Sequence, residues 1–263
     1  MIARDNSVVV MPTFARPEML AHALMHLAKA EDLPPVHIFL DSGAPEGRLD
    51  EVRWVRDTYL PQAALHQQAS HMPVTSGTWN ILKSMEFGYY YGAEYVFIVE
   101  EDVMMRHDFM ARHEAVRTSG NYKATCGRRV PAFFKKYGDL YTNPGSCLTQ
   151  KLLSVLVHHI NDEYFANTGG YIRKTFGHEP YNSSLDDGLI RMVMLETGWK
   201  CGYPEEPICA HQGFHWYDEI DIYSNRGTIQ EKIARFGRIT ASIKPGDRYA
   251  GDFEFFPNED GDR

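Results

Sequence analysis

The stretch Tyr95-Val96-Phe97-Ile98-Val99-Glu100-Glu101-Asp102 decides the fold expected of this chain. Its first five residues are apolar or aromatic and mostly favour β-structure, so segment 95–99 predicts a short buried strand. Buried carboxylates are costly without a cation, so we expect the acidic triplet at the exposed end of that strand. Carboxylate oxygens are the ligands that Mg2+ and Mn2+ prefer. The stretch therefore indicates a metal site with room for substrate phosphates, as in nucleotide-dependent enzymes.

An ordinary structural role is the alternative for these acids. Asp102 or Asp108 could cap a helix that begins with Phe109-Met110-Ala111. Such an acidic turn needs no metal, so the rest of the sequence has to decide between the two interpretations.

Composition indicates a globular protein. Of the 263 residues, 43% are hydrophobic and 24% charged, which allows a substantial core. The longest apolar runs are far too short to cross a bilayer, and Arg4-Asp5-Asn6 precludes a signal peptide. We therefore expect a cytoplasmic protein without a membrane span. The formal net charge of −8 argues against a nucleic-acid-binding surface overall, although a local patch can still be basic.

The four cysteines show neither a CxxC motif nor zinc-site spacing. Buried thiols in a reducing compartment are the simplest expectation, and a disulfide between Cys201 and Cys209 is the alternative.

Strand and helix patterns alternate along the first third of the chain. In order, they predict strand 7–11, helix 17–27, strand 36–40, helix 48–59, strand 63–66, helix 77–91 and strand 95–99. This order predicts an α/β fold with a mostly parallel sheet and helices on both faces. Ligands bind beyond the carboxyl ends of such strands. Polar residues follow three of these ends: Thr13 to Arg16, Asp41, and Glu100 to Asp102.

The second half of the sequence is less regular. Segment 123–147 holds strand-like pieces and turns, and 202–215 reads as a loop with proline and glycine. Helices are predicted over 151–160, 185–197 and 228–243, before an acidic tail.

The order of these motifs resembles the nucleotide-sugar half of a GT-A glycosyltransferase. The motifs are Pro12-Thr13-Phe14-Ala15-Arg16-Pro17 after the first strand, Asp41 after the second, Asn80 and Lys83 on a helix, and the acidic triplet. This resemblance covers roughly residues 6 to 112.

A second block resembles the later half of the inverting N-acetylglucosaminyltransferases of the N-glycan type. It comprises Leu185-Asp186-Asp187-Gly188-Leu189-Ile190-Arg191 and Cys209-Ala210-His211-Gln212-Gly213-Phe214. The triplet departs from that family's Glu-Asp-Asp at Glu101. Segment 120–180 matches no part of the family.

The resemblance implies one GT-A-like (Rossmann-like) domain over residues 1–263. Its parts are a nucleotide-sugar-binding half at 6–118, a less regular acceptor-side, catalytic half at 119–246, and an acidic tail at 247–263.

The resemblance also implies a metal site. Asp102 would bind Mn2+ or Mg2+, Glu101 would contact the ribose or support the metal through water, and Glu100 would have a supporting role. His211 or His215, in the late loop, would be a further ligand of metal or phosphate. A core or solvent-facing histidine is the alternative.

The nucleotide pocket would contain Thr13, with Arg16 on the base or phosphates and Asp41 on the uracil. Asn80 and Lys83 share a helix face, where Lys83 could reach a phosphate. The structural alternatives are a solvated Arg16, an Asx-turn at Asp41 and a solvated Lys83.

Asp186 and Asp187 are the candidates for the general base of an inverting transfer, and family position favours Asp186. Both also suit a helix N-terminus, where backbone N–H groups stabilise carboxylates.

Segment 123–141 interleaves basic and aromatic residues, which suits stacking on sugars or bases and contact with phosphates. A solvated basic face is the usual explanation of such a run.

The leading hypothesis is a metal-dependent inverting glycosyltransferase of the hexosyl- or N-acetylhexosaminyltransferase type. It would move a sugar from a nucleotide-sugar, expected to be a UDP-sugar, to a hydroxyl acceptor. The acceptor would be a glycan, a glycoconjugate or a hydroxylated base in DNA. A nucleotidyltransferase ranks lower because 12–17 has no glycine, and a non-catalytic sugar-nucleotide-binding module is the remaining alternative.

Overall fold

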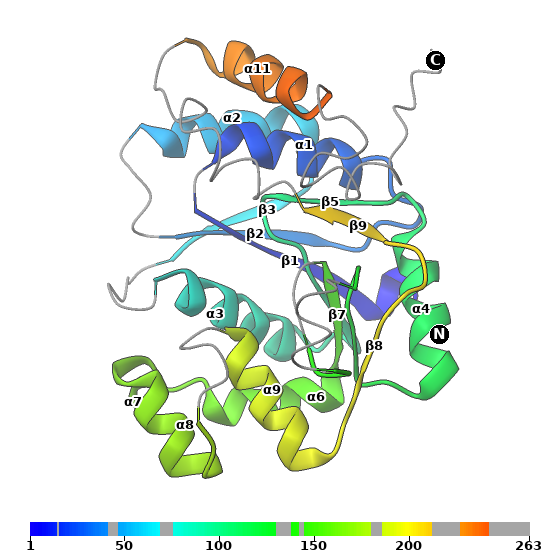
Figure 1. Cartoon of the computed structure of the whole chain (residues 1–263). Coiled ribbons are helices and arrows are strands. Elements are labelled where there is room, and N and C mark those ends of the chain that lie inside the picture. The colour runs from blue at the N-terminus through cyan, green and yellow to red at the C-terminus, as the bar shows by residue number, and fades with distance from the viewer. Residues whose placement is uncertain are drawn as a thin grey trace.

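A seven-stranded sheet runs through the centre of the molecule in the computed structural model (Figure 1). The structure describes residues 1–14, 16–41, 47–68, 76–129, 138–141, 145–179, 186–211 and 227–241. In sheet order the strands are β3 (Ala64–Gln67), β2 (Val36–Leu40), β1 (Ser7–Thr13), β4 (Tyr95–Ile98), β7 (Ser146–Thr149), β6 (Ala124–Thr125) and β8 (Cys201–Gly202).

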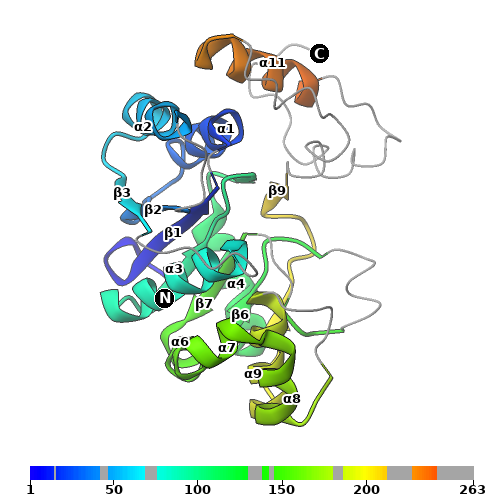
Figure 2. The ribbon, with the colours of Figure 1, turned by 90° about the vertical axis from the view of Figure 1, so that its left-hand side faces the viewer.

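Helices cover both faces of this sheet, as the alternating sequence pattern predicts (Figures 1 and 2). One face carries α1 (Pro17–Leu27) and α2 (Arg48–Tyr59), with α11 (Ile229–Ala241) packed on α1. The other face carries α3 (Ser76–Tyr91), α6 (Gln150–Leu156), α7 (Asp162–Ala166), α8 (Thr168–Phe176) and α9 (Asp186–Thr197). Helix α4 (Phe109–Gly120) packs near β6 and β8, and short 3-10 helices cover Arg4–Asn6 and Val157–His159.

Alternation along β1 divides the core into two layers. Val9 and Met11 pack with the α1 side, whereas Val8 and Val10 pack with the α3 side, and all four are fully buried. A strand buried on both faces reads as a continuous apolar run, and residues 8–11 show this pattern.

The sheet changes direction of growth at β1. Strand β1 pairs in parallel with β2 on one side and with β4 on the other. The chain thus builds β2 and β3 outward from β1 and then returns across β1 to place β4. Crevices at the carboxyl ends of strands flanking such a switch point are where ligands bind in open α/β sheets.

The second half adds antiparallel pairs and short strands that the sequence pattern did not predict, among them β8 at Cys201–Gly202. Strand β7 runs antiparallel to β4 and β6. Within the segment predicted to be a loop, β9 (Cys209–His211) pairs antiparallel with β5 (Val103–Met105), which directly follows the acidic triplet. The α/β, mostly parallel sheet is confirmed, and the loop prediction is wrong at β9.

All four cysteines are buried free thiols, so the alternative disulfide between Cys201 and Cys209 is wrong. The Sγ atom of Cys201 lies 3.3 Å from that of Cys126, the residue that directly follows the adjacent strand β6. Among the described helices, none combines the length and the apolar character needed to cross a membrane.

Candidate functional site

Two polar segments meet beside the switch point of the sheet. Arg16 follows β1, and Glu101 and Asp102 follow β4, its parallel neighbour. The expectation of an exposed acidic triplet is wrong for two of its members: Glu101 is 1% exposed and Asp102 is 4% exposed. Glu100 is half-buried, and its carbonyl oxygen accepts a hydrogen bond from the Val103 N–H at 3.0 Å.

Arg16 pairs with both buried carboxylates, and its single positive charge offsets one of their two negative charges. Its Nε atom pairs with Oε1 of Glu101, and its backbone N–H donates to Oε2 of the same side chain at 3.0 Å. Its Nη2 atom lies 3.0 Å from Oδ2 of Asp102. These charge-assisted contacts offset part of the cost of burying two acids side by side. The solvated-arginine alternative for Arg16 is therefore wrong.

His211 reaches the same carboxylate from the opposite side. The β5–β9 pairing places His211 opposite Val103, and its Nε2 atom lies 3.6 Å from Oδ1 of Asp102. Burial acts to raise the pKa of Asp102, but the charges of His211 and Arg16 outweigh it and lower that pKa. Asp102 is thus held as a carboxylate, the form that binds metals.

The donor atoms around Asp102 fit a divalent cation in part. Oδ1 of Asp102 is a buried carboxylate oxygen that accepts no hydrogen bond, and an imidazole nitrogen faces it. In the described portion of the chain, no three His, Cys, Asp or Glu side chains are grouped as a metal site. Such an incomplete set suits Mg2+ or Mn2+, which keep waters and take further oxygen ligands from substrate phosphates.

Asn80 ties the carboxyl ends of β1 and β2 together. Its Nδ2 donates to the carbonyl oxygens of Thr13, at 3.3 Å, and Phe39, at 2.9 Å. The N–H of Asp41 also donates to the Thr13 carbonyl oxygen, at 2.9 Å. Asn80, Thr13 and Asp41 are all buried. The structure brings these three predicted pocket residues to one edge of the sheet, where Asn80 acts as a brace.

Lys83 does not join this cluster through any described contact. Its Nζ atom lies 2.8 Å from Oε2 of Glu86, one turn further along α3. The phosphate role predicted for Lys83 requires this ion pair to open.

The aspartate pair at the start of α9 is only partly described. Asp187 forms an ion pair with the buried Arg191, with 2.8 Å between Oδ2 and Nη2. Asp186 is the first residue of α9, and its side chain lies outside the described residues, as does His215.

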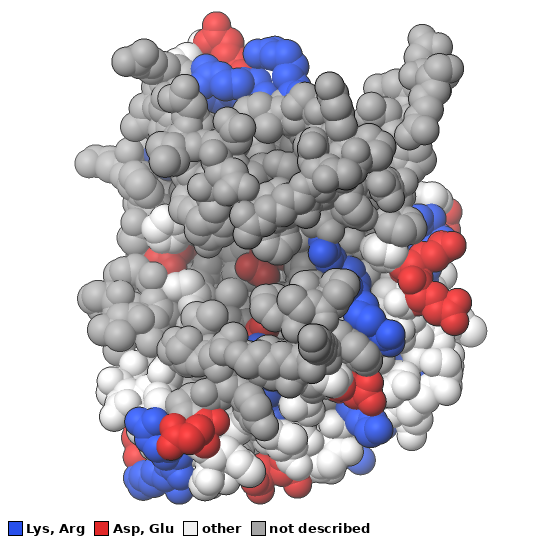
Figure 3. Space-filling model, in the orientation of Figure 1, with Lys and Arg blue, Asp and Glu red and all other residues white. Residues whose placement is uncertain are grey.

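In the basic and aromatic segment 123–141, one of the aromatic rings predicted to stack on a ligand is buried in the core. Tyr141 is fully buried, and its hydroxyl lies 2.7 Å from Oγ of Ser146. Arg129 lies over the ring of Tyr203, and residues 130–137 are outside the description. Described acidic and basic side chains are interspersed on the face shown in Figure 3.

Glu18 belongs to the surroundings of this site and was not predicted. It is fully buried on α1, two residues after Arg16, and its Oε2 accepts from Arg48 at 3.3 Å. Burial raises its pKa, Arg48 opposes this, and the charge of Glu101 raises it further. The only sequence signal was an acid in the first turn of a helix, which is common at exposed helix starts.

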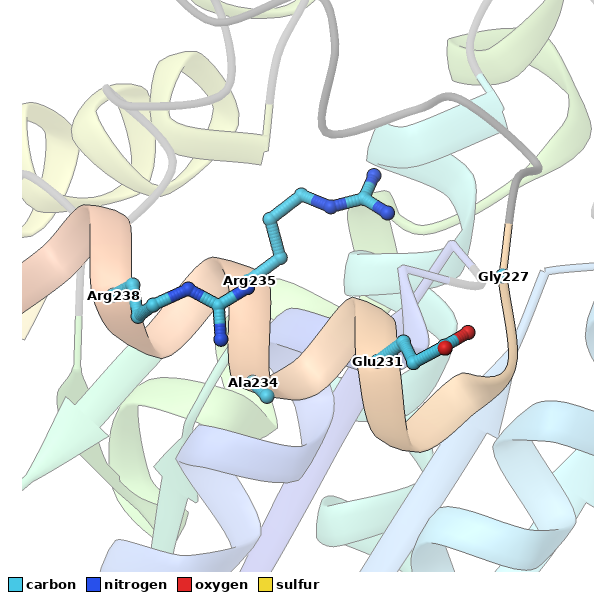
Figure 4. Close-up of a pocket in the computed structure, with 5 residues that line it drawn as sticks. All are labelled: Gly227, Glu231, Ala234, Arg235 and Arg238. Atoms are coloured by element: carbon cyan, nitrogen blue, oxygen red, sulfur yellow. The ribbon is translucent and has the colours of Figure 1, made fainter.

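A separate pocket of about 360 Å³ lies along α11 (Figure 4). Its lining residues are Gly227, Glu231, Ala234, Arg235 and Arg238. None of the residues around Asp102 lines it, so it is not part of the candidate site.

Comparison by sequence finds no matching family model and no similar curated protein. Comparison by structure finds similar folds. The mannosyltransferase PcManGT from Pyrobaculum calidifontis, solved with GDP-Man and Mn2+, aligns with 13% identity and a TM-score of 0.52 over 91% of this chain and 76% of that one. TarS from S. aureus aligns with 12% identity and a TM-score of 0.51. That alignment covers 90% of this chain and 44% of TarS. The described architecture and these likenesses identify the fold of this chain as GT-A-like.

Proposed function

We propose that this chain is a glycosyltransferase that transfers a sugar from a nucleotide-sugar to a hydroxyl group. One observation carries the proposal: Arg16, Glu101, Asp102 and His211 converge at the carboxyl edge of the parallel sheet, beside its switch point. A GT-A-like fold with such a cluster supports nucleotide-sugar chemistry, and a mannosyltransferase of similar fold was solved with GDP-Man and Mn2+.

Asp102 and His211 would hold a divalent cation, Mn2+ or Mg2+. When bound there, the cation would stabilise the negative charge that develops on the departing nucleoside diphosphate. Arg16 would contribute to the same charge stabilisation from the protein, because a guanidinium matches phosphate oxygens well.

Thr13 and Asp41 would bind the nucleoside beside the Asn80 brace, and Glu101 would contact the ribose. The resemblance to the N-acetylglucosaminyltransferases favours a UDP-sugar as the donor. The donor panel should nevertheless include GDP-sugars, since the mannosyltransferase of similar fold was solved with GDP-Man.

Inversion would follow from direct displacement. The acceptor hydroxyl would attack the anomeric carbon opposite the diphosphate, its proton would pass to a carboxylate, and the bond to the diphosphate would break. Asp186 is the base that we favour, by its position in the resemblance and because Asp187 is already engaged in an ion pair with Arg191. Loss of transfer in Asp187→Asn but not in Asp186→Asn would reverse this assignment, and NMR of the product anomer would test inversion.

The decisive experiment measures nucleoside diphosphate release from a panel of UDP- and GDP-sugars, with Mn2+, with Mg2+ and with neither. We expect slow metal-dependent hydrolysis of one donor, reduced about 100-fold or more in Asp102→Asn. Asp108→Asn is the matched control, because Asp108 pairs with Arg106 and Arg112 outside the cluster.

Absence of donor binding and turnover with every metal would contradict the proposal. A nucleotidyltransferase would then be tested with nucleoside triphosphates, and a binding module by nucleotide-sugar affinity alone. If a donor is found, acceptor screening begins with saccharides and glycoconjugates and includes hydroxymethylated DNA. A DNA acceptor would show strongly salt-dependent binding.

A further inference from the structure

Arg16 occupies the position beside Asp102 where a cation is needed. Both carboxylate oxygens of Glu101 accept hydrogen bonds from Arg16, one from Nε and one from the backbone N–H. The Nη2 atom of Arg16 forms an ion pair with Oδ2 of Asp102, at a distance of 3.0 Å. One guanidinium therefore already pairs with both buried acids and offsets one of their two negative charges.

A divalent cation and this guanidinium would compete for the same carboxylates. Two cations placed within a few ångströms of each other repel strongly, and the repulsion is greater in a buried site than in water. A metal on Oδ1 of Asp102 would lie close to the guanidinium that is 3.0 Å from Oδ2, and their mutual repulsion would weaken the metal's binding. Metal binding to the free protein should accordingly be weak.

A nucleoside diphosphate would resolve this competition. Its oxygens are good partners for a guanidinium and also good ligands for Mg2+ or Mn2+. The Arg16 side chain is 16% exposed, against 1% for Glu101 and 5% for Asp102, so Arg16 is more accessible than either acid. Arg16 and His211, whose side chain is 20% exposed, are the members of the cluster that an incoming diphosphate can reach.

We propose that Arg16 is an internal counter-cation that makes metal binding at Asp102 conditional on the nucleotide. In the free protein Arg16 compensates Glu101 and Asp102. When a diphosphate binds, Arg16 transfers its contacts to the phosphate oxygens, which frees Asp102 for the metal. This inference rests on the proposed function, because the diphosphate is that of the donor.

The test measures Mn2+ binding directly, from the EPR signal of the free aquo ion, without any sugar turnover. Wild-type protein should bind Mn2+ weakly alone and about tenfold or more tightly with saturating UDP or GDP. Arg16→Gln should bind Mn2+ without nucleotide about tenfold or more tightly than wild type, because the competing charge is gone. In that variant, UDP or GDP should increase the Mn2+ affinity much less than it does in the wild type.

Three further variants sharpen the result. Arg112→Gln removes an equal charge from pairs with Asp108 and Glu206 and should bind Mn2+ like wild type. Asp102→Asn should lose the binding in both backgrounds. Arg16→Lys, whose ammonium cannot bridge both carboxylates, should fall between wild type and Arg16→Gln; it also serves if the glutamine variant does not fold.

The inference is overturned if neither Arg16 variant binds Mn2+ more tightly than wild type. It is also overturned if wild type binds Mn2+ equally well with and without a nucleotide that itself binds. Failure of the proposed function looks different. In that case no UDP or GDP binds to any variant with any metal, while nucleotide-free Mn2+ binding still increases in Arg16→Gln.

Discussion

A single amide side chain organises the nucleotide edge of the sheet. Asn80 donates through Nδ2 to carbonyl oxygens at the ends of β1 and β2, and its Oδ1 accepts from Nε2 of Gln68 at 3.3 Å. Buried carbonyl groups that lose a donor cost free energy, so the side chain cannot be deleted without consequence. Asn80 thereby fixes the backbone from which Asp41 and Arg16 extend.

Replacing Asn80 tests whether donation, and not shape, is what matters. Asn80→Ala should lower the free energy of unfolding by about 1–3 kcal/mol, since the carbonyl oxygens of Phe39 and Thr13 each lose a hydrogen bond, although Thr13 keeps the one from the Asp41 N–H. Asn80→Asp keeps the shape but presents acceptors to these carbonyl oxygens, so it should be at least as destabilising. Urea unfolding of the two variants measures this. An aspartate variant as stable as wild type would show that Nδ2 contributes nothing.

At the scale of elements, helix α3 packs closely against β4 at Gly88. A Cβ atom added at Gly88 would lie 2.6 Å and 2.9 Å from the two methyl carbons of Val96. Val96 is fully buried in the strand that leads to the acidic triplet. The distance between helix and strand therefore depends on the absence of a side chain at this position.

Gly88→Ala should destabilise the protein by about 1–3 kcal/mol, because the added methyl forces α3 away from β4. Gly77→Ala on the same helix is the matched control. A Cβ atom there meets nothing within 4 Å. It should be neutral or stabilise by up to about 1 kcal/mol, through a less flexible unfolded chain. Thermal unfolding followed by circular dichroism compares the two. Equal melting temperatures would contradict the close packing.

At the scale of the whole molecule, burial favours the neutral form of several histidines, of which His113 is fully buried and the others are partly buried. Burial lowers the pKa of His22, His37, His66 and His159, and lowers that of His113 to about 3. His113 is fully buried between α4 and the sheet, with Nδ1 2.7 Å from Oγ1 of Thr125. Protonating such a ring requires a charge in the core.

These lowered pKa values predict loss of stability in mild acid. The contribution of His113 is fully present above its ordinary pKa of 6.5 and falls as the pH drops from 6.5 toward about 3. By about pH 5 this one histidine should cost about 2 kcal/mol of the free energy of unfolding.

Urea unfolding at several pH values between about 7.5 and 5 measures this loss. His113→Gln should be less stable than wild type at neutral pH, because the glutamine cannot reproduce the contact with Thr125. It should, however, lose about 2 kcal/mol less than wild type on acidification, since the titrating ring is gone. Identical losses in the two proteins would refute the assignment to His113.

Periodicity in the sequence was sufficient for most of the first half of the fold. Residues 7–13, 36–40 and 95–98 are strands because short β-branched and apolar runs bury on both faces of a sheet. The helices between them also lie where the helical spacing predicts. Lys83 shows what the Asn80 and Lys83 motif does not predict. Its partner in the structure is not a phosphate-binding neighbour but Glu86, three residues away on the same helix.

The sequence by itself determined the α/β layering and the candidates Arg16, Asp41, Glu101 and Asp102, because periodicity and strand ends are local properties. Only the tertiary structure decided how these groups are paired. Arg16 and Glu101 are 85 positions apart and meet because β4 returns to the far side of β1. His211 reaches Asp102 through the three-residue strand β9, too short to leave a periodic signal. Burial and charge compensation depend on such long-range contacts, which no local pattern encodes.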